Sequence, residues 1–261
     1  MWNQRRGARE TGGKRPESIH ESIYENIYRE AESVETGASM KEVKVLTKIL
    51  RANDMIAAEN RALLDSHGIC CINLMSSPGA GKTTLLEKTS QLVSDSISLG
   101  AVEGDVATSL DGERLSAAGI PTVQVNTGGG CHLDAGMIKN ALADLELDKT
   151  DLLFVENVGN LICPSSFDLG EHYRIVILSV AEGHDKPLKY PGMFISCNAV
   201  ILSKIDLVDK CNFDLSAGKE NALRVNPRLR VFELSSVEGT GMQEWVEFLG
   251  MLVKEKKAQR R

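Results

Sequence analysis

A loop of small residues between a predicted strand and a predicted helix constrains the fold of this chain more than any other feature. Residues 75–84 read M-S-S-P-G-A-G-K-T-T, an apolar run at 69–75 precedes them, and a helical pattern begins near Lys82. In this order, successive backbone N–H groups converge on phosphate oxygens, and the helix N-terminus adds partial positive charge. We therefore predict a nucleotide phosphate site. Its binding residues are Gly79, Ala80, Gly81, Lys82, Thr83 and Thr84.

One side chain of this loop, that of Lys82, has a predicted role in catalysis, and a second, that of Thr83, has a predicted role in binding Mg²⁺. Lys82 is expected to neutralise the β- and γ-phosphates, and the Thr83 hydroxyl to ligate Mg²⁺. The pattern G-x-x-x-x-G-K-[ST] fails at its first position, where Ser76 stands in place of glycine. Serine is compatible there if its φ is negative, because only a positive φ demands glycine. The alternative is an ordinary surface turn, against which the flanking strand and helix argue.

The composition bounds the class of protein. The chain has 261 residues, of which 42% are hydrophobic and 25% charged, as in an ordinary soluble protein with one sizeable domain. Its formal net charge of −6 argues against a nucleic-acid partner, because such proteins usually carry a basic face. No apolar run approaches the ~20 residues of a membrane span, and the first residues lack the apolar core of a signal peptide. We therefore expect a cytoplasmic protein with no nucleic-acid or membrane partner, whose six cysteines are buried thiols or metal ligands rather than disulfides.

From residue 69 onward, short apolar runs alternate with helical stretches. This order is typical of a parallel sheet with helices on both faces, and unbroken apolar runs are typical of strands buried on both faces. We predict an α/β fold of the P-loop NTPase class, with a predominantly parallel sheet and an N-terminal helical extension. The predicted strands are 69–75, 98–102, 122–125, 152–156, 175–180, 199–205 and 231–234, and a last helix is predicted from about Gly241 to Lys256.

The N-terminal part divides into two regions. Residues 1–40 are expected to be a flexible tail, in which isoleucine recurs every fourth residue from Ile19 to Ile27 as in a short amphipathic helix. A second helical pattern at 41–64 is the leading helix of the nucleotide-binding domain, which we place at 41–261. The predicted apolar face of this second helix contains Val45, Leu46, Ile49, Leu50, Ile56, Ala57, Leu63 and Leu64.

A motif at the end of another predicted strand indicates which base the bound nucleotide carries. Residues 201–206 read I-L-S-K-I-D and match the N/S-K-x-D element with which GTPases read guanine. A carboxylate at Asp206 accepts from both N1–H and the exocyclic amino group of guanine, at ~1.5–3 kcal/mol for each charge-assisted bond, and adenine has no such donor pair. Lys204 would lay its aliphatic stem along the base. Serine replaces the usual asparagine, which leaves open whether one hydrogen bond that braces the loop is kept.

The S-K-x-D pattern is common when taken alone, so its position decides its weight. It follows the phosphate loop by about 120 residues and precedes the segment L-S-S-V-E-G at 234–239 by about 30 residues. That segment contains Ser235 and resembles the second base-contacting loop of GTPases. Together the three elements favour GTP over ATP.

Two acidic segments end predicted strands, at the sheet edge where ligands of open α/β folds bind. One is E-G-D at 103–105, which ends in Asp105, and the other begins with Glu156, three residues before Gly159. In the acidic-x-x-Gly form, the carboxylate reaches Mg²⁺ directly or through water, and the glycine N–H reaches the γ-phosphate. We predict that Asp105 and Glu156 arrange Mg²⁺ and water, with Asp105 either a ligand or a water-orienting group. The alternative for each is a helix N-cap or an exposed loop carboxylate.

Two further stretches carry potential ligands for a second metal. G-G-G-C-H-L-D at 128–134 contains Cys131 and His132, and L-I-C-P at 161–164 contains Cys163. Thiolate and imidazole bind Zn²⁺ and Ni²⁺, and the alternative is that these cysteines are small buried filler. Adjacent Cys131 and His132 can chelate one metal only through a turn, which the three glycines permit. Since one chain supplies three groups, we hypothesise that a two-fold dimer completes a shared site.

These motifs occur together in a known family. They are A-A-E-N-R at 57–61, S-S-P-G-A-G-K-T at 76–83, E-G-D at 103–105, G-C-H-L at 130–133, E-N-V-G-N-L at 156–161, C-P at 163–164 and K-P-L-K-Y-P at 186–191. Over about residues 41–254 the chain resembles the hydrogenase nickel incorporation (maturation) GTPases. The related urease accessory GTPases share the nucleotide motifs, but their Cys-Pro-His metal motif is absent here.

The resemblance implies a metallochaperone that hydrolyses GTP with Mg²⁺ and delivers nickel during assembly of the [NiFe]-hydrogenase site. We expect hydrolysis to be slow without a partner, because no arginine is obviously placed to act in cis. It implies that Cys131, His132 and Cys163 bind Ni²⁺ or Zn²⁺ at the interface of a nucleotide-dependent homodimer. Its implied partners are other hydrogenase accessory proteins and the hydrogenase large subunit. The alternatives are a urease-type or cobalamin-enzyme accessory GTPase, and a regulatory nucleotide-binding protein without a metal role.

Overall fold

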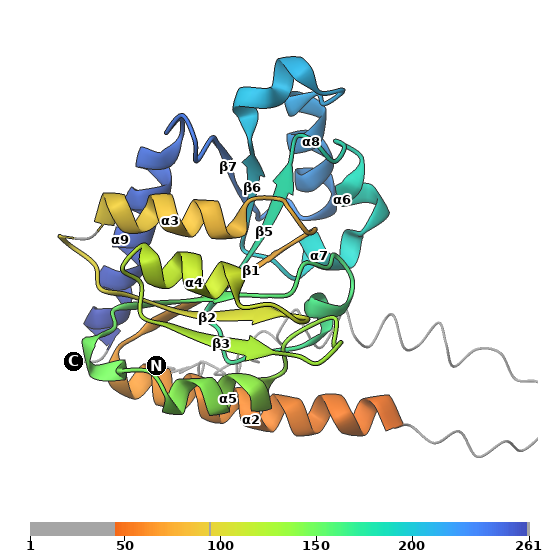
Figure 1. Cartoon of the computed structure of the whole chain (residues 1–261). Helices are drawn as coiled ribbons and strands as arrows, with labels where there is room; N and C mark the ends of the chain where they lie inside the picture. Colours follow the sequence, from red (N-terminus) through yellow and green to blue (C-terminus); the bar gives the residue numbers. More distant parts are fainter. Residues whose placement is uncertain (1–44, 94, 260–261) are drawn as a thin grey trace, which may run out of the picture. The chain divides into compact units, whose positions relative to one another are not determined.

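Seven parallel strands form one sheet in the computed structural model, which describes residues 45–93 and 95–259 (Figure 1). The strand order is β3-β2-β4-β1-β5-β6-β7, and all six neighbouring pairs are parallel. This confirms the predicted α/β fold. The strands are β1 (Cys70–Ser76), β2 (Leu99–Asp105), β3 (Thr122–Asn126), β4 (Leu152–Glu156), β5 (Tyr173–Ser179), β6 (Ala199–Ser203) and β7 (Arg230–Leu234).

Helices cover both faces of the sheet, with α3 and α4 on one side in Figure 1 and α2 and α5 on the other. The α-helices are α2 (Val45–His67), α3 (Lys82–Val93), α4 (Leu110–Ala117), α5 (Ala135–Ala143), α6 (Lys186–Lys189), α7 (Pro191–Ile195), α8 (Leu215–Val225) and α9 (Met242–Gln259). Three short 3₁₀ turns are described as well: η1 (Leu147–Lys149), η2 (Cys163–Ser166) and η3 (Ile205–Lys210).

The central strand β1 is buried along its whole length and contributes to a core on each face. Its residues Ile72 and Leu74 pack in a cluster with Trp245 of α9 and with side chains of α3. On the opposite face, Cys71 packs in a cluster with Leu64 of α2 and with side chains of α5. Burial on both faces explains why this strand reads as an unbroken apolar run rather than an alternating one.

The buried stripe of α2 differs from the predicted one. Ile49 and Leu63 are 51% and 39% exposed, whereas Asn53 and Asn60 are only 7% and 1% exposed. The two asparagines lie on one helix face with Ala57 and Leu64, at spacings of three and four residues. The apolar-face prediction was therefore wrong at two positions, because apolar periodicity does not identify amides that are buried by bonding to other backbone segments.

The carboxyl ends of the parallel strands gather the predicted site residues at one edge of the sheet. The phosphate loop follows β1, Asp105 ends β2, Glu156 ends β4, and Lys204 directly follows β6. The tail predicted at residues 1–40 lies outside the described residues. Within the described ranges, no helix is both long and apolar enough to cross a membrane.

Candidate nucleotide and metal sites

The phosphate loop between β1 and α3 depends on two glycines with positive φ. Gly79 has φ 72° and Gly81 has φ 101°, values that L side chains rarely adopt. Among the described residues, Lys204 is the only non-glycine residue with positive φ, so Ser76 has the compatible backbone that was predicted. The Lys82 Nζ donates to the Ser76 Oγ at 3.1 Å, and that hydroxyl donates to the Ser77 carbonyl at 2.7 Å. Serine at the first motif position thus orients the lysine that is predicted to bind the phosphates.

The first helical turn of α3 meets the end of β4 through a buried hydrogen bond. The Thr83 Oγ1 donates to Glu156 Oε1 at 2.8 Å. Within the described part of the chain, nothing donates to the second oxygen, Glu156 Oε2, although it is buried. Burial raises the pKa of Glu156 to about 7. A buried carboxylate oxygen without a partner, beside a threonine hydroxyl, fits a site for a hard divalent cation such as Mg²⁺.

Two further carboxylates join Glu156. Oxygens of Glu103, Asp111 and Glu156 all lie within 4.8 Å of one another. Glu103 is buried beside the end of β4, and burial raises its pKa to about 7. Its side chain also accepts a hydrogen bond from Gln124 Nε2. Sequence reasoning missed Glu103 and Asp111 as members of this cluster, although E-G-D at 103–105 was singled out.

Asp105 lies outside this acidic cluster. Its carboxylate accepts the backbone N–H of Val106 at 2.6 Å and that of Thr108 at 3.1 Å, together with the Thr108 hydroxyl. These bonds, with the Thr108 hydroxyl first, hold the pKa of Asp105 below its ordinary value. The carboxylate therefore shapes the loop after β2, and its assignment to Mg²⁺ or water stays a prediction.

The base-reading motif contacts the phosphate loop directly. The Ser203 hydroxyl donates to the Ala80 carbonyl at 2.8 Å, and Lys204 Nζ donates to the Gly79 carbonyl at 2.6 Å. The bracing hydrogen bond that was left open is therefore present with serine. Asp206 follows in the first turn of η3 and is partly exposed. These contacts tie the base-reading segment to the phosphate loop.

Two other predicted nucleotide contacts lie on loops of the same sheet edge. Ser235 is buried after β7, and its Oγ accepts the backbone N–H of Glu238 at 3.1 Å. A Cβ placed on Gly159 would lie 2.9 Å from backbone atoms of Pro78. Since real Cβ atoms do not approach that closely, glycine at 159 lets the loop after β4 lie against the phosphate loop.

An arginine also lies beside the phosphate loop, which the sequence did not indicate. Arg114 of α4 donates from Nη2 to Thr84 Oγ1 at 3.2 Å. The same guanidinium pairs with Glu87 at 2.7 Å and with Asp111 at 2.9 Å. These bonds connect α4 to α3 next to the acidic cluster.

The three predicted ligands for nickel or zinc converge in one chain. The ligand atoms of Cys131, His132 and Cys163 all lie within 4.8 Å of one another. The Cys131 Sγ lies 3.5 Å from His132 Nδ1, at a bend that follows a turn in which Gly128 and Gly129 have positive φ. The predicted turn is therefore confirmed. Burial lowers the pKa of His132, which favours the neutral imidazole that binds metals.

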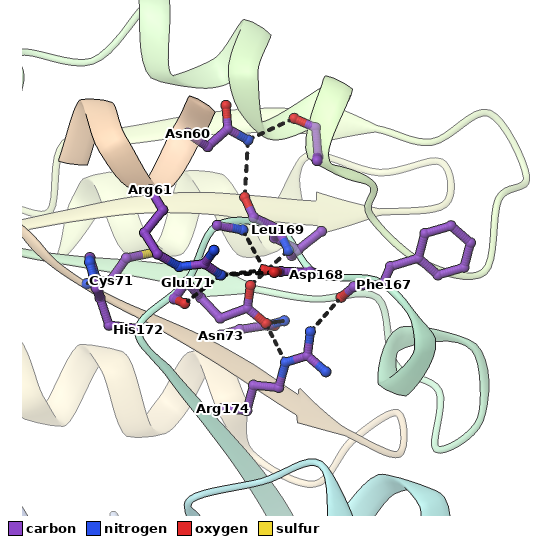
Figure 2. Close-up of polar contacts among 12 residues, drawn as sticks. Asn60, Arg61, Cys71, Asn73, Phe167, Asp168, Leu169, Glu171, His172 and Arg174 are labelled. Carbon is purple, nitrogen blue, oxygen red and sulfur yellow. Dashed lines mark hydrogen bonds and ion pairs between the residues drawn. The ribbon is translucent and has the colours of Figure 1, made fainter. Parts of the chain in front are cut away.

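The segment that carries Cys163 also supports His132. The Phe167 ring stacks on the His132 imidazole, with centroids 3.9 Å apart and planes at 28°. The Arg174 guanidinium donates to the Ser165 carbonyl at 3.1 Å. It also donates to the Phe167 carbonyl at 3.0 Å (Figure 2). Buried Arg174 thus fixes the backbone at the end of η2, the turn that begins at Cys163.

Helix α2 joins the two metal-binding segments, by which we mean residues 131–135 and 163–169, which carry the predicted metal ligands. The Asn53 side chain accepts the Ala135 N–H at 2.9 Å and donates to the Asp168 carbonyl at 2.7 Å. Asn60 donates to the Ala135 carbonyl at 2.8 Å and to the Leu169 carbonyl at 3.0 Å (Figure 2). Each asparagine therefore bonds to one residue that follows His132 and to one that follows Cys163 in the chain.

An ion pair strengthens the contact between α2 and the segment that follows Cys163. Arg61 of α2 donates from Nη2 to both oxygens of the Asp168 carboxylate, at 2.7 and 2.9 Å (Figure 2). Sequence reasoning missed Asn53 and Arg61 as supports of a metal site. The only available signal was A-A-E-N-R at 57–61, which was noted as a family motif without a physical role.

Comparison with known proteins identifies a family with a nucleotide-binding domain. Residues 70–233 match the family described as "CobW/HypB/UreG, nucleotide-binding domain". The hydrogenase maturation factor HypB of Azotobacter chroococcum is 49% identical over 207 residues, which are 79% of this chain and 68% of that protein. HypB of Escherichia coli K12 is 46% identical over 210 residues, 80% of this chain and 72% of that protein.

Two solved structures are similar in fold and sequence. HypB from Helicobacter pylori in complex with nickel aligns with a TM-score of 0.76 and 42% identity, over 79% of this chain and 97% of that one. HypB from Archaeoglobus fulgidus aligns with a TM-score of 0.73 and 40% identity, over 78% of this chain and all (100%) of that one.

Proposed function

The chain belongs to the HypB family of hydrogenase maturation factors, and from this premise we propose that it is a GTPase that carries nickel to the [NiFe]-hydrogenase active site. One observation carries the proposal. Cys163 lies seven residues after Glu156 in the chain. The two side chains belong to two different predicted sites at the same edge of the sheet. Glu156 bonds to Thr83 of the phosphate loop, whereas Cys163 converges with Cys131 and His132.

GTP binds through the loop amides and Lys82, with the base selected by Asp206. The Asp206 carboxylate accepts from N1–H and the amino group of guanine, and Lys204 lies along the base. The bonds from Ser203 and Lys204 to the Ala80 and Gly79 carbonyls support this assignment, because they hold the base-reading segment against the phosphate loop.

Thr83, Glu156 and Asp105 are the residues proposed to hold or orient Mg²⁺. The unpartnered buried Oε2 of Glu156 and the adjacent Thr83 hydroxyl fit that cation. When bound, Mg²⁺ neutralises charge that develops on the phosphates during transfer. Lys82 holds the phosphates in place, and the Gly159 N–H donates to the γ-phosphate. Hydrolysis is slow without a partner, since Arg114 is engaged by Glu87 and Asp111.

Nickel is the proposed cargo, held by Cys131, His132 and Cys163. Two thiolates and an imidazole also accept Zn²⁺ readily, so the same site binds zinc. A relative of 42% identity was solved in complex with nickel, which supports nickel as the cargo of this chain. Three ligands leave a coordination position open. We assign that position to a second copy of the chain in a GTP-dependent homodimer, and then to the hydrogenase large subunit and its accessory proteins during transfer.

Removing the ligands tests the proposal against a purely regulatory role. In Cys131→Ala and Cys163→Ala variants, Ni²⁺ affinity is expected to fall while GTP turnover per chain is retained. Cys211→Ala is the matched control, because its thiol lies in a different cluster of side chains and is partly exposed like that of Cys163. Unchanged nickel affinity in both ligand variants would support the regulatory alternative.

The identity of the enzyme that receives the nickel requires a cellular test. Loss of the gene is expected to abolish nickel-dependent hydrogenase maturation without loss of any urease activity, and added nickel is expected to restore part of the activity. Loss of urease alone would support the urease-type accessory GTPase instead.

A further inference from the structure

Two buried asparagines lie between the nucleotide edge and the metal-binding segments. Asn157 directly follows Glu156 at the end of β4 and is 1% exposed, and Asn73 in the middle of β1 is fully buried. An amide has two donor hydrogens and two acceptor lone pairs, and a buried one is costly unless these are bonded. Their hydrogen-bond partners therefore show which segments they hold together.

The Asn157 side-chain oxygen bonds to two segments at once. It accepts the N–H of Leu133 at 3.1 Å and the N–H of Val158 at 2.9 Å. Leu133 follows His132 directly, and Val158 precedes Gly159, which lies against the phosphate loop. A single oxygen atom thus fixes one metal-binding segment to the first turn of the nucleotide-contacting loop.

The Asn157 amide nitrogen continues the connection in the opposite direction. Its Nδ2 donates to Asn73 Oδ1 at 3.3 Å, and Asn73 Nδ2 donates to Glu171 Oε1 at 3.3 Å. Asn73 therefore accepts from one partner and donates to the other. Figure 2 shows Asn73 beside the Glu171 and Arg174 side chains.

Glu171 connects Asn73 to the segment that carries Cys163. Its Oε1 accepts from Arg174 Nε at 2.5 Å, and its Oε2 accepts the Leu169 N–H at 2.7 Å. Arg174 in turn holds the carbonyls of Ser165 and Phe167. A continuous set of buried side chains therefore links the residue after Glu156 to both metal-binding segments.

We propose that Asn157 and Asn73 are positioning residues, which convert a movement of segment 156–159 into a simultaneous movement of His132 and Cys163. This inference rests on the proposed nucleotide-dependent metal binding. Because every member is buried and bonded, displacement of Asn157 moves its partners with it, since otherwise buried polar groups lose their bonds. Within the described chain, the hydrogen bonds of these two side chains go to Leu133, Val158, Glu171 and each other rather than to a predicted nucleotide or metal ligand, so we expect them to set how strongly the two sites are coupled.

Asn73→Ala breaks the series of hydrogen bonds that runs from Asn157 through Asn73 to Glu171, which we call the relay. It removes the link between Asn157 and Glu171, and it leaves the bonds of Asn157 to Leu133 and Val158, and those of Arg174, in place. Nickel would be titrated into the full chain with GDP and with a non-hydrolysable GTP analogue. Wild-type protein is expected to show a ratio of dissociation constants of about 5–150, as for typical coupled sites, and Asn73→Ala a ratio below about 3. GDP affinity is expected to be unchanged.

Two further variants keep the test decisive. Asn226→Ala removes an asparagine whose Nδ2 bonds to the Phe194, Ile195 and Cys197 carbonyls, and it is expected to retain the wild-type ratio. Asn73→Ser, which places a small polar hydroxyl in the buried site, replaces Asn73→Ala if thermal unfolding shows that the latter does not fold. A wild-type ratio in a folded Asn73 variant overturns the relay and leaves the proposed function standing. A ratio of one in the wild-type chain overturns both.

Discussion

The imidazole of His132 is stacked on the ring of Phe167, with the two centroids 3.9 Å apart. The two residues come from different segments, and only the fold brings them together. The stack limits rotation of the imidazole, so that its nitrogen stays directed toward the two cysteine sulfurs. A metal ligand that is held in its bound orientation loses less entropy when the metal binds.

Replacing Phe167 by leucine is therefore expected to weaken metal binding. A ring stack contributes about 0.5–1.5 kcal/mol beyond area burial, which corresponds to about a 2- to 10-fold increase in the Ni²⁺ dissociation constant. Phe213→Leu is the matched control, because Phe213 contacts His184 at the edge of its ring with centroids 5.9 Å apart. Equal nickel affinity in wild type and Phe167→Leu would show that the stack does not orient the ligand.

The close approach of Gly159 to Pro78 predicts a catalytic defect. In Gly159→Ala the added methyl group displaces the loop after β4 from the phosphate loop. A displacement of about 1 Å in a catalytic group lowers turnover by up to about 100-fold, so we expect GTP turnover to fall about 10- to 100-fold. Gly250→Ala in α9 is the control, since no heavy atom lies within 4 Å of its Cβ position. Normal turnover in Gly159→Ala would remove this contact from the mechanism.

The buried Glu156 carboxyl predicts a pH dependence of stability. Its pKa in the folded protein is about 7, against an ordinary value of 4.5. Between these values the folded chain holds a proton that the unfolded chain has lost, so the free energy of unfolding falls as pH rises through this range. Denaturant unfolding of the Mg²⁺-free protein from pH 5 to pH 8 is expected to show this slope, and Glu156→Gln to reduce it. An identical slope in Glu156→Gln would contradict the assignment.

Asp206 predicts nucleotide specificity. Asp206→Asn turns one acceptor of guanine protons into a donor, and we expect GTP affinity to fall about 10- to 150-fold, at ~1.5–3 kcal/mol for each charge-assisted bond. Affinity for xanthosine triphosphate is expected to rise, because xanthine has a carbonyl where guanine has its amino group. Asp209→Asn, on the same 3₁₀ turn, is the control. Retained GTP selectivity would exclude Asp206 as the base-reading residue.

The sheet was predictable because its strands are buried on both faces. An apolar run such as that of β1 identifies a buried strand even when its neighbouring strands are unknown. The phosphate-loop motif indicated which edge of the sheet carries the site. The ligand trio Cys131, His132 and Cys163 was likewise predictable from residue chemistry, and the structure brings the three together.

The supports of the site were not predictable in the same way. Asn53 and Asn60 occupy positions on α2 where apolar periodicity favours other residues, because their partners are backbone groups more than seventy residues away. Glu103 rather than Asp105 lies in the acidic cluster with Glu156, because Glu103 lies opposite Glu156 in the parallel register. The Asp105 carboxylate instead accepts hydrogen bonds from Val106 and Thr108 in the loop after β2. Such choices depend on strand order, which sequence periodicity does not determine.

Nickel affinity measured in the two nucleotide states is the sharpest test of whether the nucleotide controls the metal site. Isothermal titration of the full chain with Ni²⁺, once with GDP and once with a non-hydrolysable GTP analogue, compares them under identical conditions. The account predicts dissociation constants that differ by about 5- to 150-fold between the two states, with the difference lost in Cys163→Ala. Equal dissociation constants in wild-type protein would contradict the claim that the nucleotide controls the metal site.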